Sequence, residues 1–206
     1  MSYSIPWLKL FKPVVFVLAL LPMALLVEGA INNTLGANPT ETMTRTTGDW
    51  ALYFLLMTLA VTPLRQLLGQ GWLIRYRRML GLFVFFYASV HFLTYVWFDQ
   101  FFNVSEIVAD IIKRPFITVG FLCLLLLLPL ALTSTRKMVQ RLKKNWKRLH
   151  QLVYVISLLA VLHYFMMTRA DYLQPIIVLC ILLILLAYRG FKFSKARQVN
   201  SVVGPV

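Results

Sequence analysis

The chain has 206 residues, of which 60% are hydrophobic and 14% charged, and its formal net charge is +14. Charged residues make up about a quarter of an ordinary soluble domain, so this composition excludes a typical soluble protein. The basic residues cluster at the ends of long apolar segments and form no continuous face. That pattern argues against nucleic-acid binding and indicates a membrane protein with lipid as its surroundings.

Six apolar segments are long enough to cross a bilayer core of about 30 Å. The first resembles a signal peptide but is predicted to be a retained helix, because five more spans follow it. The second is short, and no internal repeat is recognisable. The sequence therefore predicts an all-α integral membrane protein, a six-helix bundle forming one domain over residues 1–206. The predicted spans are 14–31, 50–64, 80–101, 116–132, 149–167 and 172–188.

Charge predicts the orientation of these spans. With a cytoplasmic N-terminus, the outer side holds four of the 21 basic residues, Arg45, Lys113, Arg114 and Arg169, and the inner side holds the other 17 (21 − 4). All seven acidic residues fall outside. Because basic residues are retained in the cytoplasm, both termini are predicted to be cytoplasmic. The segments 32–49, 102–115 and 133–147 are expected to be connecting loops.

Two cysteines, Cys123 and Cys180, lie inside apolar segments without a CxxC spacing. Both are predicted to be small buried hydrophobic residues, and neither indicates a disulfide framework or a zinc site.

All three histidines fall in predicted spans: His91 in the third, His150 and His163 in the fifth. Both spans run outward, so depths can be compared. His163 follows His150 by 13 residues, about 19–20 Å along a helix, and His91 follows Arg78 by the same number. His91 and His163 are therefore predicted to share an outer level, whereas His150 shares an inner level with Arg77 and Arg78.

Ionisable side chains within a bilayer are costly and usually functional. Imidazole is a common axial ligand of haem iron, and haem ligation is the favoured interpretation. Three alternatives stay open: neutral histidines that only bond neighbouring helices, a small transporter with a histidine proton relay, and a haem enzyme that oxidises quinol by itself. On an ideal helix, His150 and His163 would point about 140° apart, so either the helix is distorted or the two sites open into different sectors.

The paired histidines of the fifth span, with one on the third, resemble the ferric reductase-like transmembrane superfamily. Nearly the whole chain is similar to its MsrQ family, the haem-binding membrane subunits of the bacterial protein-methionine-sulfoxide reductase system. The segments that carry this resemblance are RRMLGLFVFFYASVHFLTY, TRTTGDWALYFLLMTLAVTPLR, KRPFITVGF, LALTSTRKM and WKRLHQLVYVISLLAVLHY.

The resemblance implies an electron-transfer subunit with one or two b haems, FMN and possibly quinone, and with no substrate-reducing site of its own. It implies a multi-pass protein of the bacterial inner membrane. It also implies electron delivery to a periplasmic molybdopterin subunit, MsrP, which reduces methionine sulfoxide. The donor would be a separate cytoplasmic flavin reductase or quinol.

For this chain we therefore expect His91 and His163 to bind one iron, and His150 to bind a second. The third span has one histidine where haem-stacking relatives have two. Three alternatives therefore stay open at the inner level: a five-coordinate iron, an unusual ligand or no haem. Arg77 and Arg78 are expected to bind a haem propionate or, if one of them is deprotonated, the iron. Gly81 and Gly120 are expected to allow close approach of a macrocycle or a neighbouring helix.

Overall fold

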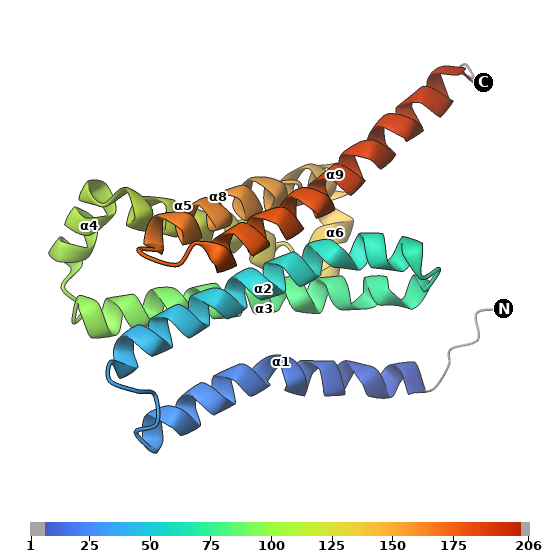
Figure 1. The fold of residues 1–206 in the computed structure, drawn as a ribbon. Helices are drawn as coiled ribbons and strands as arrows, with labels where there is room; N and C mark the ends of the chain where they lie inside the picture. The colour runs from blue at the N-terminus through green and yellow to red at the C-terminus, as the bar shows by residue number, and fades with distance from the viewer. Residues whose placement is uncertain (1–6, 203–206) are drawn as a thin grey trace.

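The computed structural model describes residues 7–202, and this range folds into helices without a strand. Within it, six helical segments are long and apolar enough to cross a membrane, which confirms the predicted architecture. The start of the first and the end of the last lie at the same end of the bundle (Figure 1). The long helices are α1 (Trp7–Ile31), α2 (Pro39–Leu67), α3 (Ile74–Thr94), α5 (Pro115–Leu132), α8 (Leu152–Met167) and α9 (Leu173–Val202).

The two ends of the bundle carry different connections (Figure 1). At one end, η1 (Gly71–Leu73) joins α2 to α3, and α6 (Arg136–Leu142) and α7 (Lys144–His150) join α5 to α8. We call this the basic end, because the stretches 65–78 and 136–148, which are these connections with the adjoining helix ends, carry 11 of the 21 lysines and arginines. The opposite, acidic end holds a π-helical turn, η2 (Tyr95–Asp99), and the short helix α4 (Val104–Lys113).

Two connecting segments expected to be loops contain helices. Segment 102–115 holds α4, and segment 133–147 holds α6 and the start of α7. Helices α4 and α6 each begin at a polar cap: the Asn103 side chain accepts from the Glu106 N–H, and the Thr135 hydroxyl from the Met138 N–H. Such caps satisfy first-turn N–H groups, and hydropathy alone does not detect them.

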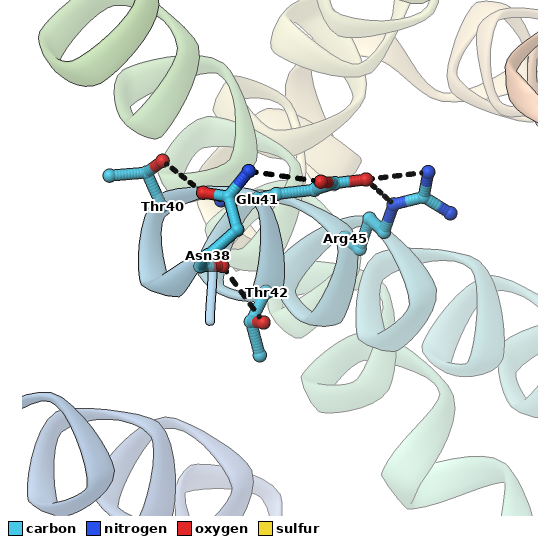
Figure 2. A network of polar contacts seen from close by, with 5 residues as sticks. All are labelled: Asn38, Thr40, Glu41, Thr42 and Arg45. Atoms are coloured by element: carbon cyan, nitrogen blue, oxygen red, sulfur yellow. Dashed lines mark hydrogen bonds and ion pairs between the residues drawn. The ribbon is translucent and has the colours of Figure 1, made fainter. Parts of the chain in front are cut away.

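The second span is longer than expected, because α2 covers 29 residues and begins in a polar stretch. The Asn38 side chain accepts from the Glu41 N–H at 3.3 Å, and its amide donates to the Glu41 carboxylate at 3.1 Å. Arg45 pairs with that same carboxylate at 2.7 Å (Figure 2). Pro39 suits the first helical turn, where no N–H is needed. This network fixes where α2 starts.

The core draws on all six long helices, and Leu59 of α2, Ile156 of α8 and Leu182 of α9 are fully buried in it. The most extensive packing joins α2 to α3 and α5 to α8. Many apolar side chains point outward instead, as expected of helices that face lipid. The cysteine prediction is half right: Cys123 is buried, but Cys180 is exposed on the outer face of α9.

Candidate functional site: histidines between facing helices

His91 of α3 and His163 of α8 face each other across the bundle. Their ring centres are 6.1 Å apart, and the ring planes are inclined at 78°. Two imidazoles bound to opposite sides of one iron would have ring centres roughly 6 Å apart, given metal–nitrogen bonds of about 2 Å and roughly 1 Å from each nitrogen to its ring centre. The prediction that the two histidines share one level is therefore correct, and the separation fits a shared metal.

Each of these imidazoles is held by a backbone carbonyl of a neighbouring helix. His91 Nδ1 lies 2.8 Å from the Thr44 carbonyl oxygen of α2, and His163 Nδ1 lies 2.8 Å from that of Phe116 of α5. A carbonyl can only accept, so each Nδ1 carries the proton and donates. Each Nε2 then has a free lone pair, the arrangement that metal-binding histidines adopt.

A glycine lies beside each imidazole. A Cβ added to Gly120 would come within 2.8 Å of His163 Cε1, and one added to Gly48 within 3.0 Å of His91 Cε1. Each glycine follows the hydrogen-bonding carbonyl by four residues. Because helical side chains lean toward the N-terminus, a larger residue there would cover that carbonyl. The two glycines thus form the cradle that admits each ring.

The ligand set at this level suits haem better than a bare ion. Among the described residues, no group of three or more His, Cys, Asp or Glu side chains is placed to hold a metal ion. Two imidazoles suffice when a macrocycle supplies the remaining ligands of the iron.

His150 lies apart from this pair, at the basic end. Its Nδ1 is 3.1 Å from the Trp146 carbonyl oxygen, and its ring stacks on Trp146 with centres 4.0 Å apart. Its Nε2 is buried without a hydrogen-bond partner. Buried polar atoms are nearly always paired, so this nitrogen marks an unmet ligand or hydrogen bond.

A cavity of about 570 Å³ opens in front of His150. Arg77 and Arg78 of α3 line it, as predicted from their level, together with Gly81. Arg77 is half-buried and Arg78 is exposed. Arg136 of α6 also lines the cavity, and its described lining holds no Asp or Glu. The cavity therefore suits a ligand that carries acid groups.

The segment from His150 to His163 is not one regular helix. The helix is interrupted: α7 ends at His150, and α8 begins at Leu152. At the break, the Gln151 N–H bonds the Arg148 carbonyl three residues back. Such a tightened turn departs from the 100° step of a regular helix, so the distortion considered from the sequence is present.

Two features of the site were missed in the sequence. Gly48 was not singled out, and the supporting carbonyls of Thr44 and Phe116 have no side-chain signal. A glycine inside a span, four residues after the residue whose carbonyl accepts the bond, is the one trace that could have indicated them.

The fold and the histidine pair define a class, the ferric reductase-like membrane proteins. The family described as "Ferric reductase like transmembrane component" matches residues 47–161. That stretch contains His91 and His150 and ends two positions before His163. No solved structure matches the chain.

Relatives of similar sequence show which family of this class the chain belongs to. The chain is 54% identical to a protein of Herminiimonas arsenicoxydans over 97% of this chain and 93% of that relative. It is 51% identical to one of Xanthomonas campestris pv. campestris (strain B100), over 82% and 78%, and 48% identical to one of Xanthomonas oryzae pv. oryzae (strain MAFF 311018), over 92% and 90%. Each is named "Protein-methionine-sulfoxide reductase heme-binding subunit MsrQ". The chain belongs to the MsrQ family.

Proposed function

We propose that this protein is the haem-binding electron-transfer subunit of a protein-methionine-sulfoxide reductase system. It would take electrons from a cytoplasmic flavin reductase or from quinol and deliver them to a periplasmic molybdopterin reductase of the MsrP kind. The observation that carries the proposal is the hydrogen bonding of the imidazoles. All three histidines donate from Nδ1 to a backbone carbonyl, which leaves Nε2 free to bind iron.

A bound haem would supply a one-electron couple whose potential depends on its axial ligands and burial. The protein's own residues do the positioning. His91 and His163 approach from different helices, so a shared macrocycle would link α3 to α8. The carbonyls of Thr44 and Phe116 hold the two rings in place through α2 and α5, which limits rearrangement when the iron changes charge.

The same hydrogen bonds weigh against the transporter alternative. In a proton relay, an imidazole passes protons through both ring nitrogens. Here Nδ1 of each outer histidine is committed to a main-chain carbonyl, which cannot receive a proton and pass it on.

The distribution of charged residues supports electron transfer from the cytoplasmic to the periplasmic side. With the basic end in the cytoplasm, as the positive-inside rule requires, an acidic donor would be attracted to that face. A negative cell interior then favours outward electron movement by about 2.3 kcal/mol per 100 mV.

The test compares purified wild type with His91→Ala and His163→Ala. We expect each variant to lose the low-spin haem of the outer level and to stop supporting methionine-sulfoxide reduction by the periplasmic partner. Haem content and optical spectra give the first result, and a coupled assay with a reduced flavin donor gives the second. The control is Thr94→Val, since that hydroxyl bonds the His91 main-chain carbonyl at 2.7 Å and not the imidazole. Wild-type haem content in both alanine variants would refute the proposal.

A further inference from the structure

The supports of His91 and His163 recur at one spacing along the chain. Each imidazole–carbonyl hydrogen bond spans 47 positions, and each cradle glycine follows its carbonyl residue by four. The differences 116 − 44, 120 − 48 and 163 − 91 are all 72. An offset of 72 residues therefore relates α2 and α3 to α5 and α8, although few residue types agree and the sequence alone showed no repeat.

The cavity at the basic end tests this offset independently, because it played no part in finding it. Seven residues of α2 and α3 line the cavity, and for five of them the residue 72 positions later lines it too. The cavity thus lies between equivalent faces of the two hairpins, as the outer histidine pair does. The five pairs are Leu55 with Leu127, Thr58 with Leu130, Ile74 with Trp146, Gly81 with Val153, and Arg78 with His150.

The last pair differs in chemistry from its outer counterpart. At the outer level the offset relates two histidines, His91 and His163; at the inner level it relates His150 to Arg78. A charged guanidinium has five donors and no acceptor, so it cannot bind iron in that form. The inner level therefore offers one imidazole nitrogen, the unpartnered Nε2 of His150.

We infer that the cavity at the basic end is the second site of an internal repeat. In this site Arg78 occupies the position at which the repeat would place an imidazole. An iron held there by His150 would therefore keep one coordination position open to a small diatomic ligand. This inference rests on the proposed haem function. The surplus of positive charge in the cavity, from Arg77, Arg78 and Arg136 without a lining carboxylate, fits the acid groups of a haem.

The experiment uses carbon monoxide as the probe on the purified, haem-loaded, chemically reduced protein. We expect carbon monoxide to shift the spectrum of one haem and to leave the other, held by His91 and His163, unchanged. His150→Ala should remove the responding haem. Arg78→His should keep the haem content, abolish the carbon monoxide response and convert the inner spectrum to that of a second low-spin, bis-imidazole site.

The matched control is Arg75→His, which adds a histidine at the same end, on an exposed position outside the cavity lining. It should keep the carbon monoxide response. An unchanged response in Arg78→His, or no response in a wild type that holds two haems, would overturn the inference. Loss of the response in Arg77→His but not in Arg78→His would overturn the register of the repeat.

The failure of this inference can be told apart from failure of the proposed function. A single haem per protein that is retained in His150→Ala but lost in His91→Ala removes the inner site and leaves the proposed function standing. Wild-type haem content and an unchanged low-spin spectrum in both His91→Ala and His163→Ala would remove the proposed function itself.

Discussion

At the scale of single residues, the site depends on how closely an imidazole can approach a helix backbone. His163 reaches the Phe116 carbonyl only because Gly120 has no side chain over it. The same holds for His91, Thr44 and Gly48, with slightly more room. Glycine in a helix costs up to about 1 kcal/mol relative to alanine, and here that cost permits the ligand orientation.

Gly120→Ala should therefore displace His163. The new methyl would lie 2.8 Å from Cε1 and 3.2 Å from Nε2, and overpacking of this kind costs about 1–3 kcal/mol. We expect a clear fall in haem content and a changed low-spin spectrum. Gly48→Ala, with its nearest contact at 3.0 Å, should show a weaker effect.

Gly190→Ala is the control for this pair, since nothing lies within 4 Å of its added Cβ. It should keep wild-type haem content. Equal haem content in all three variants would show that the glycines are not needed for ligand placement.

At the scale of helices, Arg189 of α9 connects that helix to two others at the basic end. Arg189 donates to the Tyr154 hydroxyl of α8 and to the Leu59 carbonyl of α2, both at 2.6 Å. Its guanidinium also lies 5.3 Å from the centre of the Tyr154 ring. One planar cation thus bridges three helices, with a geometry that only arginine provides.

Arg189→Lys should weaken this connection although it keeps the charge. A hydrogen bond to a charged group contributes about 1.5–3 kcal/mol, and an ammonium cannot reach both partners in the same fork. We expect a lower melting temperature of the detergent-solubilised protein. Arg75→Lys, an exposed change at the same end, should leave it unaltered; equal melting temperatures for both variants would contradict the bridging role.

At the scale of the whole molecule, the charge difference between the two ends predicts the orientation in the membrane. The connections α2–α3 and α5–α8 lie at the basic end, and the turn between α1 and α2 lies at the acidic end (Figure 1). The basic connections should stay in the cytoplasm, which places the inner cavity on the cytoplasmic side and the His91–His163 pair toward the periplasm.

Reporter fusions test this orientation. Green fluorescent protein fused after Val206 should fluoresce, and alkaline phosphatase at the same position should be inactive. Alkaline phosphatase inserted at Gly36, in the turn after α1, should be active. The opposite pattern would reverse the orientation and with it the proposed direction of electron flow.

The sequence by itself determined the six spans, the matched level of His91 and His163, and the inner level of His150 with Arg77 and Arg78. These follow from hydropathy and from the fixed rise of a helix per residue, which are local properties. It did not reveal the helices α4 and α6, because hydropathy does not detect their polar caps. It also did not reveal that Cys180 is exposed, because a helix surrounded by lipid is apolar on all sides and its sequence does not show which side faces the core.

Only the tertiary structure decided how the histidines are held. The bonds from His91 to Thr44 and from His163 to Phe116 join positions 47 residues apart, and the acceptors are main-chain carbonyls that every residue type possesses. The break at Gln151 and the 72-residue correspondence between the hairpins likewise depend on backbone placement. Side-chain identity records which groups can bind iron, whereas the packing of one helix on another fixes which nitrogen is free to do so.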